Sequence, residues 1–214
     1  MKHALPGNVD ILRMRDVQAA AALHARSFSS FFLASLGERF LAEFYAGFVH
    51  DPDAVTAVTR DAEGRLIGTV VGSVAPEQFF SRLLRRQGVR LAVASVPAVL
   101  RNPAVAVRVL RGVVYRGDVP INTSGALLSS ICVDPTAEHG GHGRQLIDAW
   151  WQRVRERGVT SAYLTTDADG NDRVNAFYQR AGWSLRGSWI TKEGRRMNCY
   201  TIVANEVASK CGLS

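Results

Sequence analysis

The stretch EHGGHGRQL, residues 138–146, contains three glycines and two histidines and lies just before an apolar helical pattern. A helix that begins among glycines presents unpaired backbone N–H groups at the positive end of its dipole. Such an end binds anions, especially phosphate, and Arg144 in the first turn would add a positive charge. The alternative is a flexible helix entry that binds nothing. The stretch alone does not separate these two interpretations.

Two common glycine motifs are excluded by the residues that follow the glycines. The nucleotide P-loop ends in Gly-Lys-Ser/Thr, whereas Gly143 is followed here by Arg144 and Gln145. The dinucleotide motif needs a third small residue at the position that Leu146 occupies. We therefore expect neither a P-loop nor a dinucleotide site.

A metal site is conceivable at His139 and His142, with Glu138 beside them. No further histidine or cysteine recurs at ligand spacing, so we expect no metal. The three cysteines give neither a disulfide framework nor zinc spacing, which fits a reducing compartment: Cys132, Cys199 and Cys211. The longest uncharged apolar run, 91–100, is too short to span a membrane. We expect an unexported, cytoplasmic protein.

Hydrophobic periodicity predicts the elements that must position these residues. The length and apolar content suit one domain, residues 1–214. Before the insertion we predict a strand at 9–14, helices at 16–27 and around 40–48, and a hairpin of 54–59 and 66–74. A helical insertion follows at about 76–116. After it we predict a strand at 126–133, a helix from about 146 to Gly158, a strand at 161–166, a short helix at 174–181 and a hairpin of 183–190 and 197–203.

The insertion is strongly basic. Residues 79–117 hold eight arginines and no acidic residue, so this segment carries +8 in a chain of +7. Pro97 and Pro103 are expected to divide it, with a separate helix at 104–115. The charge can serve an anionic substrate, a peripheral membrane contact or only a solvated face. Nucleic acid is disfavoured, because the segment has no lysine and few aromatic side chains for base stacking.

Two motifs after the insertion, ICVDPTAEHGGHGRQLIDAW and NDRVNAFYQRAGW, together resemble the GNAT superfamily of acetyl-coenzyme-A-dependent N-acetyltransferases. The first is similar to that family's strand, Val-x-Pro turn and pyrophosphate loop, with matching positions at Val133, Pro135, Gly141 and Gly143. The second is similar to its Asn-x6-Tyr motif with a Gly-aromatic pair, which places Asn171, Tyr178, Gly182 and Trp183. Glu138 departs from the pattern, since the family usually has Arg or Gln there.

The resemblance implies a fold of class α/β (α+β), with a mixed, mostly antiparallel central sheet, helices on both faces and the insertion between strands 3 and 4. It implies acetyl-coenzyme A as cosubstrate, held by a strand that splays from its neighbour and by the glycine loop. The implied cofactor-binding residues are Ile131, Cys132, Val133, His139, Gly140, Gly141, His142, Gly143, Arg144, Asn171 and Tyr178.

Tyr178 is the implied catalytic residue, because a phenol can give a proton to a departing thiolate. Its spacing with Val174 and Phe177 also suits a core aromatic. Asn171 can cap the short helix, contact the cofactor or do both. Cys132 is expected to be a small buried residue rather than a nucleophile.

No general base is assigned. Thr166 stands where some relatives carry Glu, and neither Asp167 nor Asp169 is chosen in its place. A water relay or an acceptor amine of low pKa would remove the need for a strong base.

The expected activity is transfer of acetyl to a primary amine by direct attack, with a small molecule or an amino sugar as acceptor, possibly an anionic one. Protein N-terminal or lysine acetylation and a non-catalytic acyl-coenzyme-A-binding module remain open. Phe31, Phe32 and the turn at Leu36 and Gly37, with the insertion, are expected to line the acceptor side. The chain is expected to be a monomer or a homodimer.

Overall fold

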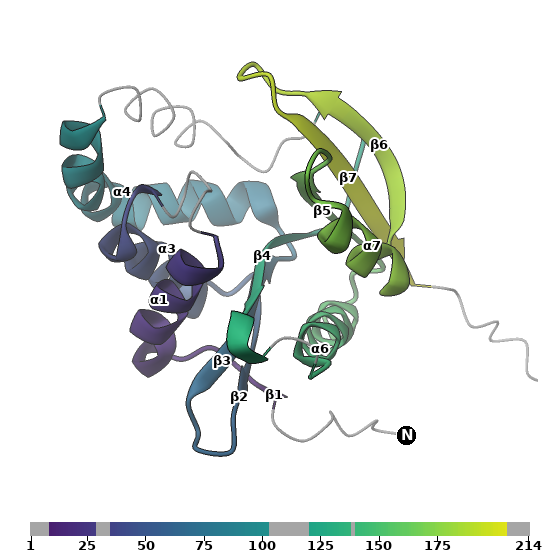
Figure 1. Ribbon diagram of the computed structural model, residues 1–214, viewed down its shortest axis with the longest axis horizontal. Helices are drawn as coiled ribbons and strands as arrows, with labels where there is room; N and C mark the ends of the chain where they lie inside the picture. Colours follow the sequence, from purple (N-terminus) through teal and green to yellow (C-terminus); the bar gives the residue numbers. More distant parts are fainter. Residues whose placement is uncertain (1–8, 29–34, 103–119, 138–139, 205–214) are drawn as a thin grey trace, which may run out of the picture.

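The computed structural model describes residues 9–28, 35–102, 120–137 and 140–204. Its strands form one seven-stranded sheet in the order β1-β2-β3-β4-β5-β7-β6 (Figure 1). The strands are β1 Val9–Asp10, β2 Ala54–Arg60, β3 Leu66–Ser73, β4 Ala126–Val133, β5 Ser161–Asp167, β6 Ser184–Ile190 and β7 Arg196–Val203. The helices are α1 Val17–Ser27, α3 Glu38–His50, α4 Pro76–Arg101, α6 His142–Glu156 and α7 Asp172–Arg180.

Helices cover both faces of the sheet. Alternation along β2 separates the two cores, because successive side chains of a strand point to opposite faces. Ala54 and Val58 pack with α1 and α3, whereas Val55 and Ala57 pack with α6. The predicted fold class is confirmed, including mostly antiparallel pairing and a helical insertion between the third and fourth strands.

The parallel pair β4 and β5 separates soon after it forms. Pairing is confined to Ala126 with Ala162 and Leu127 with Tyr163, although β4 continues to Val133. Beyond these pairs, β5 and its neighbours β7 and β6 lean away from β4 (Figure 1). From Leu128 onward, β4 therefore keeps β3 on one edge and has no strand pairing on the other within the described residues.

Two predicted elements needed correction. The first strand is only Val9–Asp10, because Leu12 N–H bonds the Thr56 hydroxyl at 3.1 Å and Met14–Asp16 forms a 3-10 turn. The predicted break at Pro97 is wrong, since α4 runs unbroken from Pro76 to Arg101. Pro97 lies in an exposed part of the helix near its end, where water can satisfy the carbonyl left without its N–H partner. The predicted helix at 104–115 lies outside the described residues.

One of the basic side chains of the insertion is structural. The Arg82 guanidinium donates twice to Asp51 at 2.6 Å and once to Asp53 at 2.5 Å. These hydrogen bonds raise the Arg82 pKa above its ordinary value. Asp51 is almost fully buried, so the pair fastens the start of α4 to the loop before β2. Arg82 is therefore occupied by hydrogen bonds within the fold and is not available to a substrate.

Candidate active site at the β4 edge and the start of α6

The glycine stretch forms the start of α6. Gly141 is the N-cap with φ of +73°, a left-handed conformation that glycine adopts without strain, and α6 begins at His142. A Cβ on Gly141 would meet no atom within 4 Å, so space is open there. A Cβ on Gly143 would instead contact the Phe177 ring at 3.5 Å, which shows how closely α7 packs here. Glu138 and His139 lie outside the described residues.

Two side chains at the start of α6 differ in their contacts. His142 has a buried Nδ1 without a hydrogen-bond partner in the described structure. Arg144 pairs with Asp148 at 2.7 Å and also donates to the Arg180 carbonyl at 3.0 Å. Arg144 thereby joins the start of α6 to the end of α7, and it would have to leave Asp148 to reach a phosphate.

The side chains of β4 divide between the two faces of the sheet. Ile131 and Val133 pack on the α6 side, whereas Cys132 faces α3, with its Sγ 3.9 Å from the Tyr45 hydroxyl. Burial raises the pKa of the Cys132 thiol to about 12, so it is not a thiolate at neutral pH. The predicted role of Cys132 as a small buried residue agrees with its burial, and its backbone can still serve a ligand on the freed edge.

A bulge in β4 completes a buried polar cluster that the sequence analysis missed. The register with β3 shifts near Ser129, so that Leu128 packs toward α6 while Ser130 faces α1. The Ser130 hydroxyl lies 3.4 Å from His24 Nδ1, and the same nitrogen lies 3.0 Å from the Tyr45 hydroxyl. The Ser129 hydroxyl is buried without a partner among the described residues. Two adjacent serines inside an apolar strand were the available sequence signal.

The buried His24 is expected to make the free energy of unfolding depend on pH. Burial lowers the His24 pKa to about 4, whereas an unfolded chain binds the proton near pH 6.5. Between these values the unfolded state binds more protons than the folded state. The His24 contribution to the free energy of unfolding is therefore fully present above pH 6.5 and is lost as the pH falls toward 4. We expect a loss of about 3 kcal/mol in the free energy of unfolding over this window.

Urea unfolding at pH 7, 5.5 and 4.5 measures this loss. A His24→Gln variant should lack this part of the pH dependence, whereas the exposed His50→Gln control should keep it. An unchanged slope in His24→Gln would show that other groups cause the acid sensitivity.

Asn171 and Thr166 are joined where β5 ends. Asn171 occupies the N-cap position of α7 as predicted, but its side chain makes no capping hydrogen bond. Its amide donates instead to the Thr166 hydroxyl at 2.8 Å and to the Asp167 carbonyl at 3.1 Å. Thr166 therefore fixes Asn171, and it presents no carboxylate that could act as a base.

The nearby acids are also engaged. Arg195 Nη2 donates to both carboxylate oxygens of Asp167 at 2.8 Å, and Asp169 pairs with Arg196 at 2.9 Å. Both carboxylates thus hold the β7 hairpin. Neither is free to act as the general base in this arrangement.

Tyr178 lies in the core that supports the site. It is 6% exposed, and its ring centroid is 5.8 Å from that of Tyr200 and 6.3 Å from that of Trp183. Burial raises the Tyr178 pKa well above its ordinary value, so the hydroxyl stays protonated across the neutral range. No hydrogen bond joins that hydroxyl to another described residue. Tyr178 is therefore both packed like a core aromatic and equipped as a proton donor.

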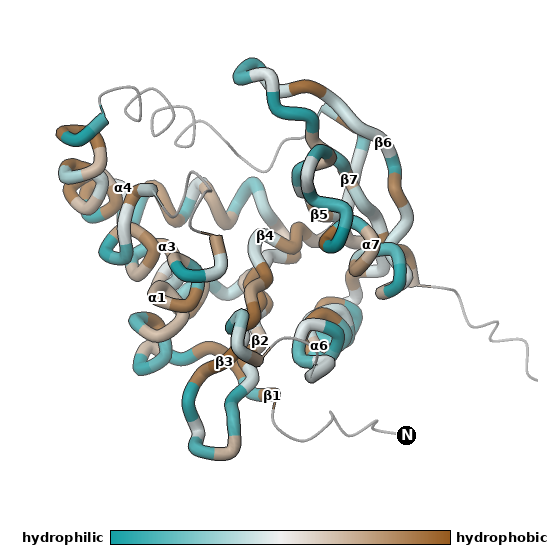
Figure 2. The backbone as a smooth tube through the Cα atoms, in the orientation of Figure 1, coloured by the Kyte–Doolittle hydropathy of each residue, from teal (hydrophilic) through white to brown (hydrophobic). Residues whose placement is uncertain are grey.

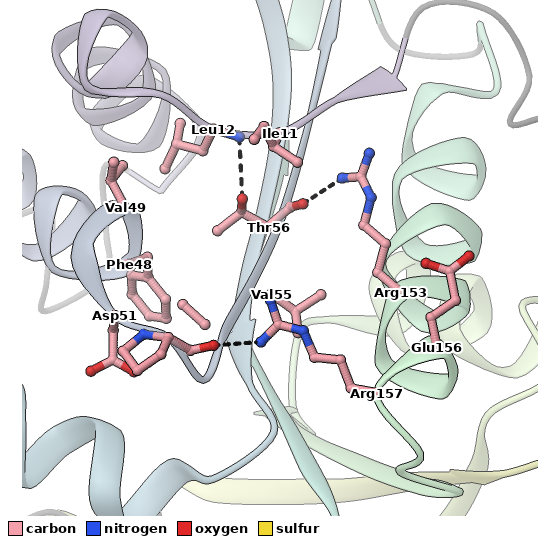
Figure 3. Close-up of a pocket in the computed structure, with 12 residues that line it drawn as sticks. Ile11, Leu12, Phe48, Val49, Asp51, Val55, Thr56, Arg153, Glu156 and Arg157 are labelled. Carbon is pink, nitrogen blue, oxygen red and sulfur yellow. Dashed lines mark hydrogen bonds between the residues drawn. The ribbon is translucent and has the colours of Figure 1, made fainter.

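A cavity of about 460 Å³ lies elsewhere, between the end of α3, the start of β2 and the second half of α6 (Figure 3). Arg153 donates to the carbonyls of Thr56 and Asp10, and Arg157 donates to that of Pro52 at 2.8 Å. Near the C-terminal end of α6, these two arginines join the helix to the backbone of the neighbouring segments. None of the predicted site residues lines this cavity.

The described residues contain no group of three or more His, Cys, Asp or Glu side chains placed to hold a metal ion. In the same part of the chain, no helix has the length and apolar character needed to cross a membrane.

Comparisons with known proteins agree with this geometry. The model of the acetyltransferase (GNAT) family matches residues 18–183. No curated protein matches the sequence. Solved structures with the same fold include the ribosomal-protein-S18-alanine N-acetyltransferase from Escherichia coli, at 14% identity and TM-score 0.57 over 96% of this chain and 98% of that chain. Ard1 from Thermoplasma volcanium has 16% identity and TM-score 0.59 over 92% of this chain and 97% of that chain.

A mutant of the spermidine N-acetyltransferase SpeG from Vibrio cholerae has 15% identity and TM-score 0.56, over 91% of this chain and 94% of that chain. At these identities the structures share the fold alone, and two of them are named for different acceptors, a ribosomal-protein alanine and spermidine. The family model, however, covers most of the chain and both motifs of the site. The chain therefore belongs to the acetyltransferase (GNAT) family, whose members transfer acetyl groups from acetyl-coenzyme A.

Proposed function

We propose that the protein is an N-acetyltransferase that moves acetyl from acetyl-coenzyme A to a primary amine by direct attack of the amine. The observation that carries the proposal is the β4 edge, which loses its β5 partner after Leu127 and leads into the glycine start of α6. An extended amide chain can pair with such an edge, and a pyrophosphate can bind at the helix N-terminus. Coenzyme A combines these two parts in one molecule.

The residues at the edge fit this cosubstrate. Gly141 leaves open space beside the helix N-terminus, and the buried His142 Nδ1 lacks a partner in the described structure. When bound, acetyl-coenzyme A supplies an activated acetyl thioester. The residues that would hold it are Ile131, Cys132 and Val133 through their backbone, and His139, Gly140, Gly141, His142, Gly143, Arg144, Asn171 and Tyr178.

The chain's own groups then have separate tasks. Tyr178 holds a proton on its hydroxyl for the departing thiol, and its burial keeps that proton in place at neutral pH. The free backbone N–H groups of the β4 edge can hydrogen-bond the thioester carbonyl. Cys132 stays out of the chemistry, because a buried neutral thiol is a poor nucleophile.

The acceptor is proposed to be a small-molecule amine or amino sugar that enters from the side of α4 and the turn before α3. Leu36, in that turn, packs against Ala98 of α4, so the two segments form one continuous wall. Phe31 and Phe32, predicted to line this side, lie outside the described residues. Because the named neighbours act on a protein alanine and on spermidine, a test panel should include peptide N-termini and polyamines.

The test combines coenzyme A binding with turnover. We expect calorimetric binding of coenzyme A, and acetyl-coenzyme-A-dependent thiol release with at least one amine of the panel. Gly141→Val should weaken coenzyme A binding at least about tenfold, because its side chain would fill the open space beside the helix N-terminus.

Gly194→Val is the matched control, since Gly194 also has a positive φ, of +80°, and open space around it, but lies in the β6–β7 turn. It should cost similar backbone strain and leave coenzyme A binding unchanged. Equal effects of the two variants would count against the loop as the binding site. Binding without turnover of any amine would instead favour the non-catalytic acyl-coenzyme-A-binding module. Two observations support that candidate: Thr166 stands where some relatives carry Glu, and the carboxylates of Asp167 and Asp169 are both ion-paired.

A further inference from the structure

Helix α4 carries an exposed apolar stripe on the side that faces solvent. Its four members are Val89, Val93, Val96 and Leu100, with exposed fractions of 79%, 60%, 48% and 79%. At 100° per residue these positions fall within about 60° of the helix circumference. They extend over roughly 16 Å along the axis. Exposing four aligned aliphatic side chains to water is unfavourable. Contiguous apolar surfaces of this kind are typical of sites that bind a partner or a membrane.

Arginines border this stripe on both sides. By the same helical spacing, Arg85 and Arg86 lie one turn before Val89, one on each side of the stripe, and Arg90 lies one turn before Val93. Arg90 approaches Glu43 of α3 at 4.0 Å, while no described carboxylate lies within ion-pair distance of Arg85 or Arg86. Between residues 78 and 101 the helix has no acidic residue. Figure 2 shows apolar and hydrophilic positions interleaved along α4.

The opposite side of α4 belongs to the protein core. Phe79, Leu83 and Leu91 are buried with α3, and Ala98 is buried with Leu36. The exposed stripe is therefore a second apolar surface of the helix. Removing the whole insertion would open the core, so the stripe has to be tested by point substitutions.

We propose that this face of α4 binds an anionic lipid surface, with the helix lying in the plane of the headgroups. A helix of this kind inserts its apolar side chains between headgroups while its arginines pair with lipid phosphates. A second copy of the chain fits poorly, because both copies would bring the same basic face to the contact, with no acid on it to pair with the arginines. Nucleic acid also fits poorly, since the centre of the surface is aliphatic.

Co-sedimentation of the full chain with vesicles tests the proposal. We expect binding to phosphatidylcholine vesicles containing about one third phosphatidylglycerol, and weak or no binding to phosphatidylcholine alone. Binding should decrease when salt rises to about 0.5 M, because the arginine contribution is screened. Equal binding to both vesicle types, or no binding to either, would overturn the proposal.

Paired variants identify the surface. Arg85→Gln with Arg86→Gln should weaken partitioning about twenty-fivefold, at about fivefold for each arginine. Val93→Ser with Leu100→Ser should weaken it at least about tenfold. The matched controls remove similar groups away from α4: Arg155→Gln with Arg186→Gln, and the exposed Ile190→Ser with Val203→Ser.

The controls should bind like the native chain, and all variants should keep native coenzyme A affinity, which shows that they are folded. Losses of vesicle binding in the controls as large as in the α4 variants would overturn the assignment to α4. Analytical ultracentrifugation tests whether the same face instead forms a contact between two copies of the chain. If the chain is a dimer that Val93→Ser with Leu100→Ser dissociates, while vesicles never bind it, the face is a contact between copies and the proposal is wrong.

Discussion

Tyr178→Phe is expected to lower kcat for acetyl transfer by about a hundredfold to a thousandfold, the usual contribution of a positioned general acid. The substitution removes one hydroxyl and keeps the ring, which packs against Trp183 and Tyr200. Because that hydroxyl bonds no other described residue, its loss should cost little stability. Because the ring stays in place, coenzyme A affinity should change much less than kcat, whereas thiol release should be nearly lost.

Tyr200→Phe is the matched control for this prediction. Tyr200 is as deeply buried, but its hydroxyl donates to Asn175 Oδ1 at 3.0 Å and so has a structural task. Its loss should reduce the free energy of unfolding by about 1 kcal/mol and leave kcat largely unchanged. If Tyr178→Phe keeps kcat within about threefold of native, Tyr178 is a core aromatic and the proton comes from elsewhere.

Trp150→Ala is expected to lower the free energy of unfolding by about 4 kcal/mol, the largest stability effect predicted for this chain. The Trp150 side chain is fully buried at the centre of the α6 contact with the sheet. Its Nε1–H donates to the Val55 carbonyl at 3.0 Å, and its ring lies where a Cβ on Gly72 would come within 2.6 Å. Truncation would leave a large cavity and a buried carbonyl without its donor.

Trp151→Ala provides the comparison on the same helix. Trp151 is half-buried at the margin of that core, so its truncation should cost about 1 to 2 kcal/mol. Chemical denaturation of both variants measures the difference. Similar losses for the two would mean that α6 is held mainly by contacts other than Trp150.

The order of the elements could be predicted because short-range patterns determine it. Helix α6 follows from the 3.6-residue spacing of its apolar side chains, and the hairpin of β2 and β3 from alternation around Gly64, whose φ is +80° as such a turn requires. The break predicted at Pro97 failed, because a proline near the end of a helix costs less when the contacts of Leu91 and Ala98 hold the helix in place.

The candidate site was predictable only in part. The glycine loop and the Asn171–Tyr178 motif are contiguous in sequence, so their spacing carried the family resemblance. The cluster of His24, Tyr45 and Ser130 could not be found in this way. Its members come from α1, α3 and β4, up to 106 positions apart, and a single bulge residue turns Ser130 toward the helices.

The sequence by itself determined the local pattern: a helix that begins among glycines, predicted to bind phosphate, and a short amphipathic helix that carries Tyr178. The tertiary structure decided which of the charged groups are free. Arg82 is bound by Asp51 and Asp53, whereas Arg85 and Arg86 reach solvent beside an apolar stripe. The physical reason is that ion pairing and burial depend on contacts between distant segments, which residue spacing within one segment does not specify.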